Sequence, residues 1–189
     1  MPSVRVTRTY LQMLSPAALH SFHSNEAGVR FERVRDCPVS FYRYLYTEVG
    51  RRHHWVDRLT WSDEQVAARL EDPRVSIWVM YVDGAPAGYA ELERHADDSM
   101  EIAYFGLLPE FLRRGLGKLM LTAAVDRAWE QGASRVWLHT CTLDDPAALP
   151  NYLKRGFTPY KEEEYSVEID ERELATLAEG HPRSATPAT

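Results

Sequence analysis

Residues 107–118 read Leu107-Leu108-Pro109-Glu110-Phe111-Leu112-Arg113-Arg114-Gly115-Leu116-Gly117-Lys118 and join a β-prone segment to a helical one. Glycines at 115 and 117 remove side chains where the backbone must turn sharply. The amides at the helix start then point outward at the positive end of the helix dipole, which suits a pyrophosphate. Arg113, Arg114 and Lys118 add positive charge nearby. The stretch therefore predicts a phosphate-binding turn between a strand and a helix.

Two other phosphate-binding motifs are excluded. The Walker A pattern G-x-x-x-x-G-K-[ST] is absent, and the third glycine of the dinucleotide fingerprint is missing. A Gly-x-Gly pair at a strand-to-helix turn is a weak signal by itself. Its alternative interpretation is a tight turn that carries surface arginines.

Upstream of this stretch, the hydrophobic pattern predicts two helices and five strands. Phe41, Leu45 and Val49 recur at spacing four and indicate the first helix. Ser62 and Gln65 form a capping box at the start of the second helix. Strands are expected at 4–11, 29–35, 75–82, 87–94 and 100–107, with Asp83-Gly84 as a hairpin turn.

Downstream, the pattern predicts a largely buried helix at 116–131, a strand at 135–142 and a final strand at 158–169. A short helix is expected at 146–155, broken or kinked by Pro150. The strand–helix–strand unit from 100 to 142 is expected to be a right-handed parallel crossover. The fold class is therefore α/β, with a mixed, mostly antiparallel central sheet and helices on both faces.

Composition narrows the class of protein. The chain has 189 residues, enough for one domain with a hydrophobic core, and a formal net charge of −6. Its pI of about 5.7 argues against a nucleic-acid partner and weakly favours a cationic amine. Apolar runs stay below the ~20 residues of a membrane span, and no secretory signal is seen. Two cysteines make no disulfide framework, which fits a reducing compartment. Together these features lead us to expect a cytoplasmic protein without a membrane partner.

Seven histidines raise the question of a metal. His20 and His23 form the only separated short pair, without a nearby Cys or Glu at zinc spacing. His53 and His54 are adjacent, which is rare for ligands of one metal on a helix. We predict no metal.

With these motifs the chain resembles the GNAT superfamily of acyl-CoA N-acyltransferases. It is similar to bacterial members of that family, and the resemblance does not assign an acceptor substrate. That family shares Arg/Gln-x-x-Gly-x-Gly/Ala at the start of a helix. Gly115 and Gly117 match, and Leu112 departs from the first place. The second family motif, Asn-x-x-Ala-x-x-x-Tyr-x-x-x-Gly-Phe, is matched by Ala148, Tyr152, Gly156 and Phe157, with Asp145 in place of Asn.

The resemblance implies a single GNAT domain over 1–175, with its core at 29–170, and acetyl-CoA as co-substrate. Residues 176–189 are rich in Pro, Ser, Thr and Ala and are predicted to be a disordered tail. The family's two strands around the phosphate turn splay apart and hold pantetheine between them. The resemblance also allows a homodimer. It places acetyl-CoA on Phe105, Gly106, Leu107, Arg113, Arg114, Gly115, Leu116, Gly117, Lys118, Asp145 and Ala148.

Acetyl transfer to an amine needs a base for the ammonium proton and an acid for the departing thiolate. By resemblance, Tyr152 is the acid and Glu101 the base. The alternative interpretations are that Tyr152 only packs in the core and that Glu101 is a surface residue. Glu91 and Glu93 share a strand face and could act through a water, with Glu91 the second candidate base. His139 and Cys141 either line the thioester gap or pack in the core.

The acceptor wall is expected in the first two helices and their connection, where Tyr42, Tyr46, Trp55 and Trp61 could hold a cationic amine or could simply pack. We expect an N-acetyltransferase that acts on a primary amine of a small molecule. The alternatives are a protein or peptide acetyltransferase for lysine or N-terminal amines, a catalytically silent acyl-CoA-binding sensor, and an interaction scaffold.

Overall fold

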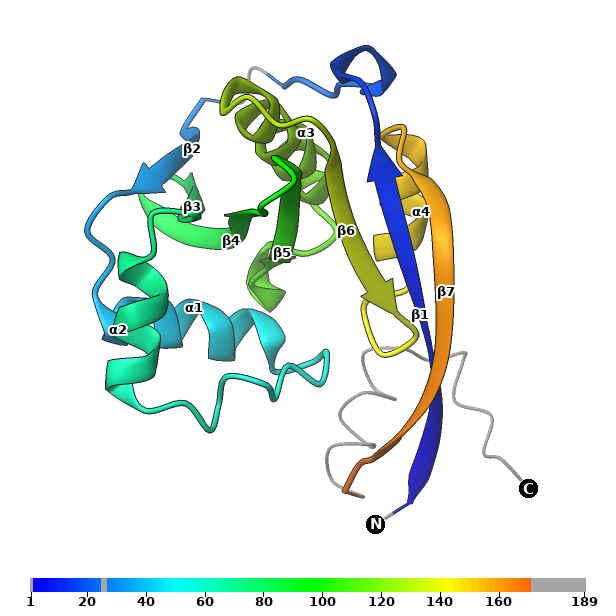
Figure 1. Ribbon diagram of the computed structural model, residues 1–189. Coiled ribbons are helices and arrows are strands. Elements are labelled where there is room, and N and C mark those ends of the chain that lie inside the picture. Colours follow the sequence, from blue (N-terminus) through cyan, green and yellow to red (C-terminus); the bar gives the residue numbers. More distant parts are fainter. Residues whose placement is uncertain (1, 25–26, 171–189) are drawn as a thin grey trace.

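A computed structural model of the chain describes residues 2–24 and 27–170 (Figure 1). Its strands form one sheet in the order β2-β3-β4-β5-β6-β1-β7, which confirms the predicted mixed α/β fold. The strands are β1 (Ser3–Met13), β2 (Val29–Val34), β3 (Val75–Val82), β4 (Ala85–Arg94), β5 (Met100–Leu107), β6 (Val136–Cys141) and β7 (Thr158–Glu168). The helices are α1 (Val39–Gly50), α2 (Asp63–Glu71), α3 (Leu116–Glu130) and α4 (Ala148–Lys154), with short 3-10 turns η1 (Pro16–Ala18) and η2 (Pro109–Phe111).

The predicted elements hold with small shifts at their ends. β3 and β5 have the predicted bounds, and the Ser62–Gln65 capping box begins α2. The predicted break at Pro150 is wrong, because α4 begins only at Ala148 and the proline falls in its first turn. A missing N–H costs no intrahelical bond there. The predicted tail over 176–189 lies outside the described residues. Among the described helices, none is long and apolar enough to cross a membrane.

β5 and β6 are parallel and diverge soon after they begin. They pair only at Met100–Val136 and Glu101–Trp137. β5 then continues beside β4 as far as Leu107, and β6 continues beside β1. Figure 1 shows the two strands separating toward the lower end of the sheet. We call this feature the β5–β6 divergence (residues 102–107 and 138–141).

The N-terminal strand lies inside the sheet, between β6 and β7. β1 pairs antiparallel with β6 from Arg8–Cys141 to Met13–Val136. On its other side it pairs with β7 from Ser3–Glu168 to Gln12–Thr158. The part of the sheet beyond the β5–β6 divergence therefore consists of β6, β1 and β7, which come from early and late segments of the chain.

The helices cover the sheet on both faces. Leu121 and Val125 of α3 pack with Ala90 of β4 and Leu138 of β6. Tyr42, Leu45 and Val49 of α1 pack with Tyr89 of β4 on the opposite face, since neighbouring residues of a strand point to opposite sides. The β5–β6 divergence therefore lies between two well-packed layers.

We expect Gly156→Ala to lower the free energy of unfolding by about 3 kcal/mol or more. Gly156 has a φ of +100°, and an added Cβ would lie 1.9 Å from the carbonyl oxygen of Ala18. Gly84→Ala is the matched control, because Gly84 also has a positive φ, +88°, but nothing lies within 4 Å of its added Cβ. Urea unfolding measures both variants. Equal losses would contradict the close contact between α4 and the segment after β1.

Candidate active site

The turn before α3 leaves an exposed helix N-terminus. Gly115 is the N-cap residue with a left-handed φ of +76°, and no side chain of the described residues caps this end. Arg113 also has a positive φ, 61°. Arg113, Arg114 and Gly115 are exposed. First-turn amides of a helix without a cap are free to bind an anion.

Two cations of this turn lie against aromatic rings. The Lys118 ammonium is 3.8 Å from the ring centroid of Phe22, which lies in the segment between β1 and β2. The Arg114 guanidinium is 5.1 Å from the ring centroid of Phe111. Within residues 2–24 and 27–170, neither cation has a carboxylate partner at ion-pair distance. Their charge is thus available to an anion at the start of α3.

The start of α4 lies beside the start of α3. The Asn151 amide donates a hydrogen bond to the carbonyl of Gly117 over 3.4 Å. Asp145 Oδ1 accepts the N–H of Ala147 over 2.8 Å, and the Asp145 carbonyl accepts the N–H of Ala148. Asp145 therefore shapes the turn into α4. Asn151 was missed by the sequence analysis, because nothing in its spacing marks it.

Tyr152 lies at the inner side of α4 next to β5. Its side chain is buried, and its ring contacts Phe105 and Phe157 with centroid distances of 6.1 and 6.2 Å. Burial raises the pKa of Tyr152 well above its usual value, with smaller contributions from Asp144 and Asp145. The hydroxyl therefore stays protonated at neutral pH and can act as a donor.

Glu91, the second candidate base, is fully buried and paired with two arginines. Arg58 binds both carboxylate oxygens, over 2.5 and 2.9 Å, and Arg69 binds Oε1 over 2.7 Å. Tyr42 donates its hydroxyl to Oε2 over 2.8 Å. Burial alone would raise the pKa of Glu91, but Arg58 and then Arg69 outweigh it and the net pKa is lowered. A carboxylate held in this Glu91 cluster (Glu91, Arg58, Arg69 and Tyr42) is a weak base.

Three of the predicted acceptor residues, Tyr42, Tyr46 and Trp61, lie around Arg58. The Arg58 guanidinium lies 4.9 Å from the Trp61 ring and 4.4 Å from the Tyr104 ring. Tyr46 accepts the backbone N–H of Arg58 over 3.2 Å. Tyr42 and Tyr46 are only 1% and 2% exposed, which leaves them little surface for a substrate.

Trp55 is half-buried and packs on Tyr104 and Tyr46, with centroid distances of 4.9 and 5.7 Å. The Trp55 ring also lies over the backbone of Gly106, where an added Cβ would come within 3.6 Å of it. Trp55 and Tyr104 thus bring aromatic surface from the α1–α2 connection and from β5 to the edge of the β5–β6 divergence. Arg58, Arg69 and Tyr104 carry no spacing signal that the sequence analysis could have used.

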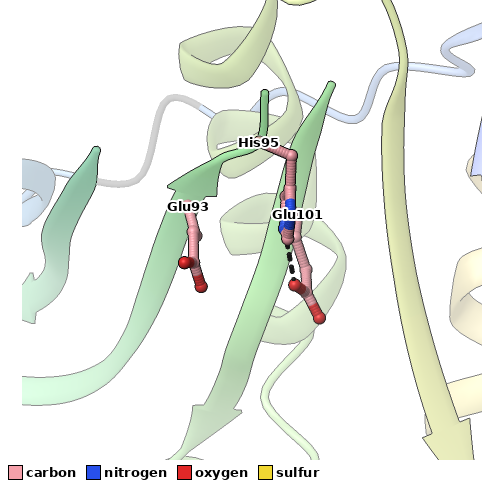
Figure 2. Close-up of side chains that lie close together, drawn as sticks. All are labelled: Glu93, His95 and Glu101. Carbon is pink, nitrogen blue, oxygen red and sulfur yellow. Dashed lines mark hydrogen bonds and ion pairs between the residues drawn. The ribbon is translucent and has the colours of Figure 1, made fainter. Parts of the chain in front are cut away.

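Glu101 has a different environment from Glu91. Its side chain is 13% exposed, and its Oε2 lies 2.9 Å from Nε2 of His95. Figure 2 shows the two groups side by side, with Glu93 on the neighbouring strand. Burial raises the pKa of Glu101, and the hydrogen bond to His95 opposes this rise. Glu101 thus has one oxygen engaged by His95 and a pKa displaced toward that of a useful base.

Glu93, His95 and Glu101 offer ligand atoms that all lie within 4.8 Å of one another. This donor set could in principle hold a divalent cation. The Arg69 guanidinium, however, binds Glu93 over 2.5 Å and already supplies positive charge there. The absence of a metal therefore stays a prediction.

His139 and Cys141 lie on β6 and are both half-buried. The ring of His139 contacts Tyr10 of β1 with centroids 5.7 Å apart. Burial raises the pKa of the Cys141 thiol to about 11 and lowers the pKa of His139. Both groups are therefore neutral at physiological pH. This agrees with either interpretation, packing in the core or lining the thioester gap.

Comparison with known proteins gives a matching family model and related curated proteins. A family model described as the acetyltransferase (GNAT) family matches residues 34–157. An uncharacterised N-acetyltransferase of Mycobacterium tuberculosis is 33% identical over 96 residues, covering 51% of this chain and 61% of that protein. Mycothiol acetyltransferase of Corynebacterium aurimucosum is 37% identical over 144 residues, covering 60% of this chain and 47% of that protein. The chain thus spans about three fifths or less of the length of these curated relatives.

A solved structure supports the fold. The GCN5-related N-acetyltransferase from Kribbella flavida has a TM-score of 0.62 and 23% sequence identity, and the match covers 87% of this chain and 59% of that one. The family model spans more than half of the sequence, including α1 through Phe157. The chain therefore belongs to the GNAT acetyltransferase family.

Proposed function

We propose that the protein transfers the acetyl group of acetyl-CoA to a primary amine of a small molecule by direct attack of the amine. The observation that carries this proposal is the β5–β6 divergence, which opens beside the uncapped start of α3. Pantetheine can extend along one strand as β-augmentation, and pyrophosphate can bind helix amides. Membership of an acetyltransferase family supports the same donor.

Acetyl-CoA would bind mainly through the backbone. From Ile102 onward, the edge of β5 that faces β6 has no partner strand among the described residues. Backbone groups of Phe105, Gly106 and Leu107 would bind the pantetheine and the thioester. The pyrophosphate would lie on the amides of 115–118, with charge from Arg113, Arg114 and Lys118. Asp145 and Ala148 would act indirectly, by shaping the turn beside this site.

Tyr152 would assist the leaving group. A tyrosine hydroxyl has an ordinary pKa of about 10, above the value of about 8.5 for a free thiol. Burial raises the pKa of Tyr152 further, so the hydroxyl is a donor throughout the physiological range. It would give a hydrogen bond or a proton to the thiolate as the C–S bond breaks.

Glu101, rather than Glu91, would remove the ammonium proton. An alkyl ammonium has a pKa of about 10.4, so forming the neutral amine at pH 7 costs about 4.6 kcal/mol. Glu91 has both oxygens bound by guanidinium groups, whereas Glu101 has one oxygen outside its hydrogen bond with His95. The proton would move to Glu101, directly or through a water, while the amine nitrogen forms a bond to the thioester carbon.

A small-molecule acceptor is favoured by one relative, which is named for mycothiol. The net charge of −6 also favours a cationic amine over an anion. We place the acceptor near Trp55 and Trp61, on the side of the sheet where Glu101 lies. Tyr42 and Tyr46 would support this region from the core. A cytoplasmic location and a homodimer stay predictions.

We expect Glu101→Gln to lower kcat/KM for an amine acceptor by about 100-fold or more, because general base catalysis contributes this much. Steady-state release of CoA thiol with 2-phenylethylamine as the acceptor measures the change. Acetyl-CoA affinity, measured by calorimetry, is expected to stay within a few-fold of the wild type.

Glu93→Gln is the matched control, since Glu93 lies opposite Glu101 on β4 but is bound to Arg69. Its kcat/KM is expected to change much less. Equal losses in the two variants, or no loss in Glu101→Gln, would refute the assignment of Glu101 as the base.

A further inference from the structure

His95 lies in the turn between β4 and β5 and contacts Glu101 from outside the strands. Its Nε2 is 2.9 Å from Glu101 Oε2 (Figure 2). Its ring also contacts Trp137 of β6, with centroids 5.3 Å apart. Glu101 and Trp137 are register partners at the last point where β5 and β6 pair. The imidazole therefore lies at the closed end of the β5–β6 divergence.

Hydrogen bonds hold the backbone of the turn that carries this imidazole. The backbone N–H of His95 donates to the Ser99 carbonyl over 2.9 Å, and the Asp98 N–H donates to the His95 carbonyl over 3.0 Å. Trp137 donates its Nε1–H to Ser99 Oγ over 3.2 Å. The turn is thus held to β6 through the same tryptophan that packs on the imidazole, so the ring is well placed to orient a neighbour.

Exposure separates the two members of the pair. The side chain of Glu101 is 13% exposed and that of His95 is 37% exposed. A buried carboxylate loses solvation, which disfavours its charged form, and a hydrogen bond donated to it restores part of that loss. His95 is the group that Glu101 contacts by a side-chain hydrogen bond within the described part of the chain.

The surrounding charges partly cancel. The carboxylate of Glu93 faces the pair from β4, and the Arg69 guanidinium reaches it from α2. Arg74 adds positive charge near Glu93 from the segment before β3. The turn itself carries Asp97, which pairs with Arg135 at 3.6 Å. Glu93 and Arg69 act on Glu101 in opposite directions, which leaves the direct bond from His95 as the larger specific effect.

We infer that His95 is a positioning residue for the base: its Nε2–H donates to Oε2 of Glu101, keeps that carboxylate ionised and leaves Oε1 as the oxygen that takes the ammonium proton. This inference rests on the proposed role of Glu101. The proton leaves the amine nitrogen and binds Oε1, while His95 keeps its own proton throughout. His95 is thus needed for the orientation and the charge of Glu101 but does not touch the substrate.

The test is the titration of the Glu101 carboxyl by carbon NMR in protein labelled with 13C-glutamate, with the Glu101 signal assigned from its loss in Glu101→Gln. We expect His95→Phe, which keeps an aromatic ring against Trp137, to raise the Glu101 midpoint by about one pH unit. His95→Gln keeps an N–H donor of sufficient reach and is expected to restore most of the wild-type midpoint. His95→Asn is shorter and is expected to behave like His95→Phe, which covers the case that the Phe variant does not fold.

The pH dependence of kcat/KM with 2-phenylethylamine supplies a second measurement. The acidic limb of kcat/KM reports the base of the free enzyme, so it is expected to move upward in the Phe and Asn variants and not in the Gln variant. His23→Phe is the control, because His23 lies near Asp126 of α3, on the other face of the sheet.

Two results overturn the inference. An unchanged Glu101 midpoint in both His95→Phe and His95→Asn shows that the imidazole does not act on the carboxylate. A Gln variant that shifts as far as the Phe variant shows that a donor at this place is not what matters. A failure of the proposed function can be told apart from these two results, because Glu101→Gln would then leave turnover unchanged. That result would also refute the inference, which depends on Glu101 as the base.

Discussion

Replacing Gly117 with tryptophan is expected to lower the affinity for acetyl-CoA by about 100-fold or more, which corresponds to about 2.7 kcal/mol of binding free energy. Gly117 is in the first turn of α3, where the proposed pyrophosphate would meet the backbone amides. An indole there would fill the space that the phosphate oxygens need. Calorimetric titration of acetyl-CoA and of CoA measures the loss.

Gly117→Ala is the matched control for this variant. An added Cβ at Gly117 would lie 3.8 Å from Leu107 and 3.9 Å from Asn151, which are ordinary contacts. The alanine variant is therefore expected to fold and to bind acetyl-CoA within a few-fold of the wild type. If the tryptophan variant folds and keeps wild-type affinity, the phosphate site is not at the start of α3.

The second large effect is on stability, at the Glu91 cluster. Glu91→Gln is expected to lower the free energy of unfolding by about 3–5 kcal/mol, because it leaves the buried guanidinium of Arg58 without a carboxylate and that of Arg69 with Glu93 alone. The size of the side chain hardly changes, so no cavity contributes. Glu32→Gln in the exposed pair with Arg30 is the control, with an expected loss below about 1 kcal/mol.

The same cluster predicts how stability depends on pH. The pKa of Glu91 is lowered in the folded state, so the cluster contributes its full stability above the unfolded pKa of about 4.3. That contribution is lost as the pH falls through the folded pKa. Chemical unfolding from pH 7 down to pH 3 is therefore expected to bring the wild type and Glu91→Gln closer together. A constant difference across this range would show that the charge of Glu91 is not what stabilises the cluster.

Local signals explain what the sequence could predict. The predicted strands at 75–82 and 100–107, the Ser62–Gln65 capping box and the Gly-x-Gly turn depend on neighbours within a few residues, and the structure has them as expected. The strand–helix–strand unit around that turn also follows from the order of elements. These features placed the parallel pair β5 and β6 beside the start of α3.

Long-range contacts explain what the sequence could not predict. β1 pairs with β7 although Thr9 and Glu162 are far apart in the chain, and no periodicity specifies a strand's partner. Arg58 and Arg69 come to Glu91 from two different segments. The residues alone could not decide between Glu91 and Glu101 as the base, because the difference lies in their folded surroundings: two arginines bind Glu91, and His95 contacts Glu101.

The aromatic residues show the same limit. Tyr42 and Tyr46 share a helix face, which fits either a substrate wall or a core. Their hydroxyls bind Glu91 and the backbone of Arg58, so the cation that these rings surround belongs to the protein. Only the folded arrangement shows that the α1–α2 connection brings its own guanidinium to this place.

The most direct test of the account is to incubate the purified protein with acetyl-CoA and a panel of small primary amines, beside a lysine-containing peptide, and to measure CoA release and product mass together. The account predicts release that depends on a small amine, with a product heavier by one acetyl group. Acetylation of the peptide alone would contradict the small-molecule acceptor. Binding of acetyl-CoA without transfer to any amine would contradict the enzyme itself and indicate an acyl-CoA-binding sensor.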